Sequence, residues 1–281
     1  MTPTRNGQDR LARFSLNQAT TKHWPLPDLV ESSARAGLQW VGLWREPVEE
    51  YGLARSAKLV ADAGLRVSSL CRGGFLTATD PVERRRRIAD NRNAIEECSS
   101  LGCDVLVLVA GGMPAGSRDV DGARSRLREG IAELAPYALK HGVRLAVEPL
   151  HPMFTSDRCV VSTLGQALDI AEAVGSDAVG VVVDAYHVWW DPTVYEEIAR
   201  AAGRIASFQV CDWSTPLPAE VLLGRAMVGD GVIELRRLRE ACDAAGYDGP
   251  IETEIFNAEI WNAPGDITLG AAIDRYLEHV A

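Results

Sequence analysis

Short runs of apolar residues alternate with longer amphipathic segments along the whole chain. The runs Val105–Val109 and Val179–Val183 carry no polar side chain, which is typical of parallel strands buried on both faces. The pattern predicts eight strands: Arg13–Asn17, Trp40–Trp44, Arg66–Cys71, Val105–Ala110, Arg144–Glu148, Val179–Asp184, Ala206–Cys211 and Ile251–Ile255. It predicts eight helices: Pro27–Ala36, Val48–Ala63, Pro81–Leu101, Gly122–His141, Thr163–Val174, Pro192–Ala202, Ile233–Ala245 and Asp266–Val280.

Glycines mark the ends of most of these helices, where a left-handed C-cap favours glycine. They are Gly37, Gly64, Gly102, Gly142, Gly175, Gly203 and Gly246. Neither a Pro/Ser linker nor a low-complexity tract divides the 281 residues, so we expect one domain over residues 1–281. Right-handed crossovers between eight parallel strands predict a single (β/α)8 TIM barrel. A doubly wound open sheet is the alternative, because a miscounted strand would change one fold into the other.

Charge and composition exclude several classes of protein. The net charge of −10 disfavours a nucleic-acid partner, because an acidic surface repels phosphate backbones. The six cysteines form no CxxC pair, which favours a reducing compartment over a disulfide framework. The segment Met1–Arg13 has no apolar core of a secretory signal, and the apolar runs are too short to cross a bilayer. We therefore expect a soluble cytoplasmic protein without a membrane partner.

Acidic residues follow the apolar runs of neighbouring predicted strands. Glu148, Asp184 and Glu254 each come at the end of such a run, and a barrel builds its site at the carboxyl ends of its strands. A single acid at such a position is more often a helix N-cap. Three acids together predict a shared cation, because an unpaired carboxylate is costly there. Hard oxygen ligands favour one Mn²⁺ ion, or Mg²⁺.

Two histidines follow these acids at a spacing of three residues. His187 follows Asp184 and would bind a substrate hydroxyl, or alternatively cap the next helix. His151 follows Glu148 and is a candidate acid or base, although a structural loop histidine would have the same spacing.

Basic and aromatic side chains follow other predicted strands. Arg72 lies in the glycine-rich segment after the third predicted strand, and Arg225 in the one before the eighth. Either could face an oxyanion or be an ordinary surface arginine. Trp44 and Trp189 lie at or beyond strand ends, where aromatic faces suit sugar C–H surfaces, with core packing as the alternative.

These motifs resemble the xylose-isomerase-like barrel superfamily of sugar isomerases and epimerases over nearly the whole chain. The resemblance is carried by Glu148 in LAVEPLH, by Asp184 and His187 in a D-x-x-H motif, by Glu254 in an E-x-F motif, and by Arg225 four residues before a G-x-G. It implies two metal-binding glutamates that also transfer protons, an aspartate ligand, and a substrate-binding histidine and arginine. The strand-seven histidine ligand of the family is replaced here by Gln209, whose amide oxygen can still bind Mn²⁺ or Mg²⁺.

The segment Phe208–Trp213 also resembles a bacterial branch that includes catalytic subunits of C-glycoside deglycosidases, which cleave 3-keto glycosides by elimination. The shared chemistry is proton loss next to a carbonyl, with an enediolate stabilised by the metal. The expected substrate is therefore a sugar for an isomerase or epimerase, or a keto-glycoside for a lyase. A second copy of the chain or a small subunit is a candidate partner.

Two classes of function are alternatives. An endonuclease-IV-like phosphodiesterase should carry more metal-binding histidines than the five present and a basic face. A non-catalytic sugar-binding barrel would not need both Glu148 and Glu254.

Overall fold

The strands form a closed parallel barrel in the computed structural model, which describes residues 10–281. The barrel strands are β1 (Phe14–Asn17), β2 (Trp40–Trp44), β3 (Arg66–Gly74), β4 (Val105–Val109), β5 (Arg144–Glu148), β6 (Val179–Asp184), β7 (Ile205–Val210) and β10 (Ile251–Thr253). Their order around the barrel is β1-β10-β7-β6-β5-β4-β3-β2. The prediction of a (β/α)8 barrel is confirmed, and the open sheet is excluded. The prediction about a signal at Met1–Arg13 rests mainly on residues 1–9, which lie outside the described residues.

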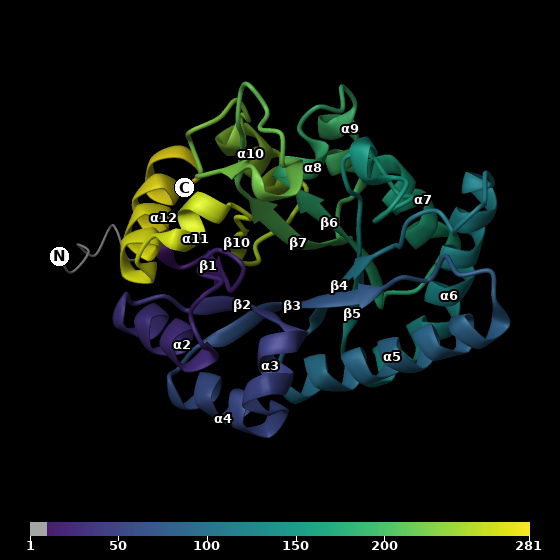
Figure 1. The fold of residues 1–281 in the computed structure, drawn as a ribbon, viewed down its shortest axis with the longest axis horizontal. Helices are drawn as coiled ribbons and strands as arrows, with labels where there is room; N and C mark the ends of the chain where they lie inside the picture. Colours follow the sequence, from purple (N-terminus) through teal and green to yellow (C-terminus); the bar gives the residue numbers. More distant parts are fainter. Residues whose placement is uncertain (1–9) are drawn as a thin grey trace.

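Helices surround the strands, as Figure 1 shows. The longer ones are α2 (Leu26–Arg35), α4 (Leu53–Asp62), α5 (Pro81–Ser100), α6 (Val120–Lys140), α7 (Leu164–Val174), α9 (Val194–Arg200), α10 (Leu235–Ala244) and α12 (Gly265–His279). All seven glycines that the sequence places at helix ends have a positive φ, between 65° and 87°. Each helix that one of these glycines follows therefore ends within two residues of its predicted end, and the chain turns back toward the next strand.

One predicted helix is wrong. The segment Val48–Ala63 forms two helices, α3 (Arg45–Tyr51) and α4, because Gly52 between them has φ of 97° and a right-handed helix cannot pass through that conformation. Several short elements are also absent from the sequence pattern, because they are too short to show a period. They are α8 (Ala185–Val188), α11 (Ala258–Asn262), the 3₁₀ turns η1 (Pro152–Phe154) and η2 (Val221–Leu223), and the antiparallel pair β8 (Asp212–Trp213) and β9 (Arg225–Ala226).

The core has two parts, separated by the strands. Along β4, Leu106 and Leu108 belong to the large cluster that includes the helices. Val105 and Val107 belong to a smaller cluster with residues of other barrel strands, as expected from the alternation of side chains along a strand. The barrel interior is thus filled, and the site must lie at the strand ends. In residues 10–281, the helices are too short or too polar to cross a membrane.

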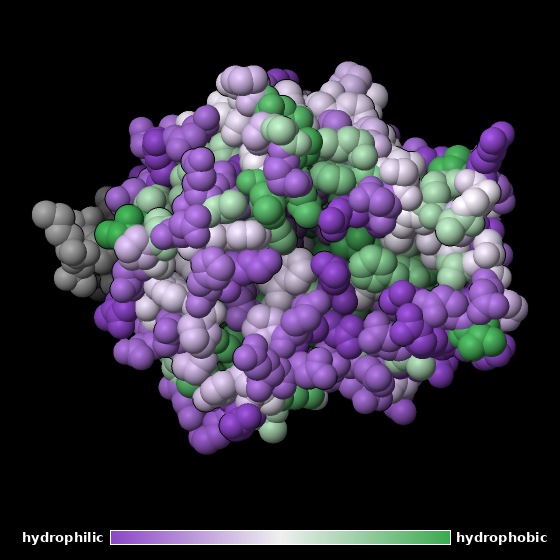
Figure 2. All heavy atoms as spheres, viewed as in Figure 1, coloured by the Kyte–Doolittle hydropathy of each residue, from purple (hydrophilic) through white to green (hydrophobic). Residues whose placement is uncertain are grey.

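Figure 2 shows the surface in the same view as Figure 1. Hydrophilic residues cover most of this face, and hydrophobic residues gather mainly near its middle. The large exposed apolar side chains are Val82, Leu139, Val232 and Ile267. They lie on α5, on α6, in the loop before α10 and on α12, respectively.

Candidate active site

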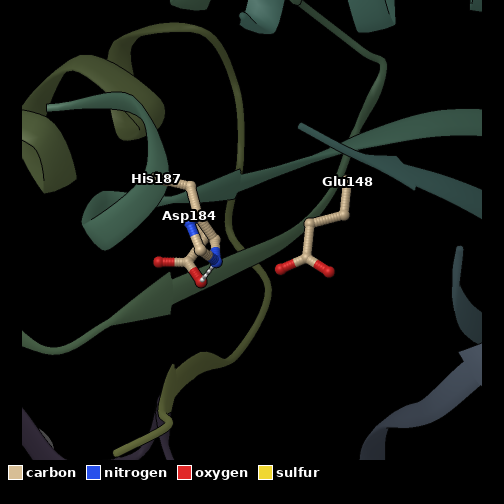
Figure 3. Close-up of side chains that lie close together, drawn as sticks. All are labelled: Glu148, Asp184 and His187. Carbon is tan, nitrogen blue, oxygen red and sulfur yellow. Dashed lines mark ion pairs between the residues drawn. The ribbon is translucent and has the colours of Figure 1, made fainter. Parts of the chain in front are cut away.

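Three buried carboxylates converge at the carboxyl ends of the barrel strands. Glu148 ends β5, Asp184 ends β6, and Glu254 follows β10 directly. Their relative exposures are 6%, 0% and 4%. One oxygen each of Glu148 and Asp184 and a ring nitrogen of His187 lie within 4.8 Å of one another, and Figure 3 shows these side chains extending into the same space. The structure thus brings together residues that are more than 100 positions apart.

Arg225 lies among these carboxylates. Its Nη1 donates to Glu254 Oε2 at 3.1 Å and to Asp184 Oδ2 at 3.4 Å. Its guanidinium lies 4.8 Å from the ring centres of both Tyr186 and Phe256. Since Arg225 is only 5% exposed, its charge acts at short range on the acids around it.

His187 connects the arginine with the loop after β5. Its Nδ1 accepts from the backbone N–H of His151 at 3.2 Å, and its Nε2 lies 3.1 Å from Arg225 Nη2. Burial, followed by the charge of Arg225, holds the pKa of His187 well below its usual value. A neutral imidazole accepts at only one nitrogen, so only one of these two contacts is a hydrogen bond at a time. The Nε2 atom also lies 3.7 Å from Asp184 Oδ2 (dashed in Figure 3).

The buried carboxylates outnumber the positively charged side chains that contact them. Burial raises the pKa of Glu148 well above its usual value, and the charges of Asp184 and Glu254 raise it further. Burial likewise raises the pKa of Glu254 to about 8, although Arg225 opposes that shift. Three acids thus face one arginine, which leaves room for a further cation.

Gln209 supplies an additional oxygen at the same level of the barrel as Asp184. It pairs with Asp184 across β6 and β7, and with Glu252 across β7 and β10. Its Nε2 donates to Glu252 Oε1 at 3.2 Å. Because a carboxylate accepts, this contact fixes which end of the amide is the oxygen, and Oε1 has no partner within residues 10–281.

Glu252 is a buried acid whose role sequence reasoning missed. It is 1% exposed. Asn17 Nδ2 donates to it at 2.7 Å, and the hydroxyls of Ser68 and Ser69 also donate to it. The signal was present, because residues two apart on a strand share a face, so Glu252 had to point into the barrel like Glu254. It forms a polar layer together with Gln209.

The donor set fits one divalent cation. Glu254 Oε1 and Gln209 Oε1 are buried oxygens without a hydrogen-bond partner in the described part of the chain. Buried polar atoms are rarely left unpaired, and an oxygen-bound cation would satisfy both. Glu148 and Asp184 would complete the set with carboxylate oxygens, which Mn²⁺ and Mg²⁺ prefer. The predicted ligands therefore suit the ion, and Asp184 and Gln209 are neighbours in the strand register.

A cavity of about 260 Å³ opens onto this cluster. Its lining includes Glu148, His187, Arg225 and Glu254, with Arg72 at its side. An outer cavity of about 430 Å³ shares several lining residues with it and extends to one further aromatic side chain, Trp261. The residues common to both are Trp44, Arg72, Arg158, Leu222 and Phe256. The two spaces therefore adjoin. Six of the residues predicted to act on or bind the substrate line the inner one: Trp44, Arg72, Glu148, His187, Arg225 and Glu254.

Two of the residues predicted to act on or bind the substrate, His151 and Trp189, lie outside the lining of both cavities. His151 packs against the rings of Trp190 and Trp213, with centroids 5.4 and 5.0 Å away, and its Nδ1 accepts from Met153 N–H. Trp189 packs against Trp213 at 5.4 Å. Both therefore support the loops behind His187 in this structure, and their roles in catalysis and substrate binding stay predictions.

Comparison with known proteins places this chain in a family. The family model described as xylose isomerase-like TIM barrel matches residues 30–276, and the chain belongs to that family. Inosose isomerase of Bacillus velezensis is 26% identical over 232 residues, which cover 81% of this chain and 80% of that protein. L-ribulose-5-phosphate 3-epimerase UlaE of Salmonella typhi is 25% identical over 213 residues, which cover 74% of this chain and 71% of that protein.

Solved structures show the same fold. Protein SMc04130 from Sinorhizobium meliloti 1021 has a TM-score of 0.94 and 43% identity, covering 96% of this chain and 99% of that one. The IOLI protein, solved with a bound zinc atom, has a TM-score of 0.84 and 21% identity, covering 95% and 98%. The curated relatives named here are an isomerase and an epimerase that act on sugars or sugar-like compounds.

Proposed function

We propose that this chain is a divalent-metal-dependent isomerase or epimerase, which removes and returns a proton next to the carbonyl of a sugar or sugar-like substrate. The observation that carries the proposal is that Glu148 and Glu254 line one cavity together with Arg225 and His187. Two strands, β6 and β7, separate the strands that carry these glutamates. The names of the relatives point to the same chemistry.

The proposed ligands are Glu148, Asp184, Gln209 and Glu254, with Mn²⁺ as the preferred ion and Mg²⁺ as an alternative. When bound, the ion supplies positive charge that polarises the substrate carbonyl and stabilises the negative charge formed on its oxygen. An all-oxygen set suits these hard ions better than a set with imidazole would.

The side chains of the site transfer the proton and bind the substrate. One glutamate takes the proton from the carbon next to the carbonyl, and the other returns a proton to the neighbouring carbon or to the opposite face. Glu148 and Glu254 both line the inner cavity, so each carboxylate can accept a proton from a bound substrate or donate one to it. Arg225 and neutral His187, which contact each other, orient the substrate oxygens by hydrogen bonds.

The proposal is tested by proton exchange in D₂O. The metal-loaded protein is incubated with ketoses, their phosphates and inososes, and deuterium at the carbon next to the carbonyl is measured by NMR. We expect incorporation for at least one of these substrates, and loss of incorporation after chelation. If the Mn²⁺-loaded protein exchanges no proton on any ketose or inosose tested, the proposal is wrong.

A second candidate is a lyase that cleaves 3-keto glycosides, including C-glycosides, by β-elimination. It is favoured by the outer cavity, since Trp44, Phe256 and Trp261 line a space that could hold an aromatic aglycone. The same proton abstraction would then expel the group β to the carbonyl. Release of a phenol from a 3-keto glycoside, followed by absorbance, separates this lyase from the isomerase.

A further inference from the structure

Basic side chains surround the place where the inner and outer cavities adjoin. Arg72 and Arg158 line both cavities, and Lys22 lines the outer one. The chain as a whole has a net charge of −10, and the floor of the inner cavity carries carboxylates. A group of three cations at the entrance is therefore opposite in sign to its surroundings.

The Arg72 guanidinium is fixed by aromatic rings and not by an acid. It lies 5.4 Å from the ring centre of Trp44 and 5.3 Å from that of Phe75. Such stacking orients the planar group but uses none of its five N–H donors. Within residues 10–281, the Arg72 side chain forms neither a hydrogen bond nor a salt bridge, so its donors remain available to a ligand.

Arg158 and Lys22 are similarly available. The contact of Arg158 with an acid is with its neighbour Asp157, at 3.7 Å and without a hydrogen bond. Lys22 lies 4.5 Å from the ring centre of Trp261. The acids that also line these cavities at the entrance are Asp157 and Glu46, and both are exposed to solvent.

These cations are not the counterions of the catalytic carboxylates. Arg225 is the basic group that lowers the pKa of both Glu148 and Glu254, and it holds Asp184 and Glu254 directly. Arg72 and Arg158 are therefore available to bind a ligand that enters the cavity. The two guanidinium groups suit an oxyanion, because their N–H forks match phosphate and carboxylate oxygens.

We propose that the substrate carries an anionic group, a phosphate or a carboxylate, at the end remote from the reacting carbon, and that Arg72 and Arg158 bind this group at the junction of the two cavities. Lys22 adds positive charge on the outer side. This inference rests on the proposed function, because it names the class of sugar that the same site accepts. A site of this kind would bind sugar phosphates or sugar acids more tightly than neutral sugars.

The test measures binding without turnover. Ribitol, ribitol 5-phosphate and ribonate have no ketone and cannot react, so their affinities for the Mn²⁺-loaded protein can be measured by calorimetry. We expect one of the two anions to bind at least about 10-fold more tightly than ribitol, because hydrogen bonds between charged groups are stronger than those between neutral groups. Whichever anion binds more tightly identifies phosphate or carboxylate as the group.

Variants locate the effect. Arg72→Gln and Arg158→Gln should each lower the affinity for the anion by roughly 10-fold or more. The affinity for ribitol should stay the same. Arg55→Gln is the matched control, because Arg55 also stacks on an aromatic ring, Tyr51 at 5.1 Å, but lines neither cavity. Melting temperatures of all variants show whether they fold.

Equal affinity for all three compounds would overturn the inference. It would also be overturned if both arginine variants keep the anion's affinity, because the anion would then bind elsewhere, for example to the metal. Tight anion binding by a protein that exchanges no proton would instead contradict the proposed function and leave this site standing.

Discussion

A buried carboxylate costs free energy unless a cation or several donors stabilise its charge, and Glu148 and Glu254 are both buried with few donors. Each lies at or directly after a strand, so its position is fixed by the barrel and not by a mobile loop. We therefore expect both to serve as ligand and as acid or base.

Replacing either glutamate by glutamine tests this dual role. Glu148→Gln and Glu254→Gln keep an oxygen for the metal but remove the base, so turnover should fall by about 10²–10⁴-fold while bound metal, measured by elemental analysis, remains. Glu196→Gln on the exposed face of α9 is the control and should keep full activity. Wild-type deuterium exchange in both glutamine variants would exclude these residues as the base.

The acids could be predicted from the sequence because each directly follows an apolar run. The positions of His151 and Trp189 could not be predicted, because the direction of a side chain beyond a strand end depends on the loop. Both turn toward Trp213 in the structure. Glu252 could have been predicted from its spacing to Glu254, but its donors come from β1, β3 and β7, and only the closed barrel brings these together.

At the scale of elements, a two-residue strand positions the central arginine. Arg225 lies on β9, which pairs with β8. Asp212 on β8 accepts from the backbone N–H groups of Trp213, Gly229 and Ile233, at 2.9, 3.0 and 3.0 Å. The Asp212 carboxylate thus holds both ends of the loop that carries Arg225. The sequence showed this loop only as a glycine-rich segment, because strands of two residues give no alternation.

Asp212→Ala should therefore loosen the loop without unfolding the barrel. We expect faster amide hydrogen exchange in residues 213–233, a fall in kcat/KM, and a loss of stability on the order of 1–3 kcal/mol for the unsatisfied buried donors. Asp230→Ala is the comparison, since Asp230 is exposed on the same loop and pairs with Arg275. If exchange in 213–233 stays at the wild-type rate, Asp212 does not hold the loop.

For the whole molecule, ring closure creates the site. Strands β5, β6, β7 and β10 pair with one another in that order, and the pairing of β10 with β1 closes the sheet, so that their carboxyl ends surround one space. The number and order of strands could be predicted from the repeating pattern, and with them the group of acids at one end. The cavities could not be predicted, because they depend on how loops from distant segments pack over the strand ends.

A bound ion should also stabilise the whole fold. A ligand that binds only the folded state adds about 2.7 kcal/mol when its concentration is 100 times its Kd, so Mn²⁺ should raise the melting temperature by several degrees and chelation should reverse this. The variant with both Glu148→Gln and Glu254→Gln should show a smaller shift. Calorimetric melts that are identical with EDTA and with Mn²⁺ would contradict a metal site.

The polar layer of Glu252 and Gln209 also depends on a glycine of another strand. A Cβ atom at Gly42 on β2 would lie 2.6 Å from Cδ of Glu252, so the carboxylate occupies the volume that this glycine leaves open. A larger residue at position 42 would displace this carboxylate from its donors, and the Gln209 amide would lose its acceptor. These three positions, on three different strands, are therefore structurally coupled, and we expect a change at one of them to be tolerated better when the other two change with it.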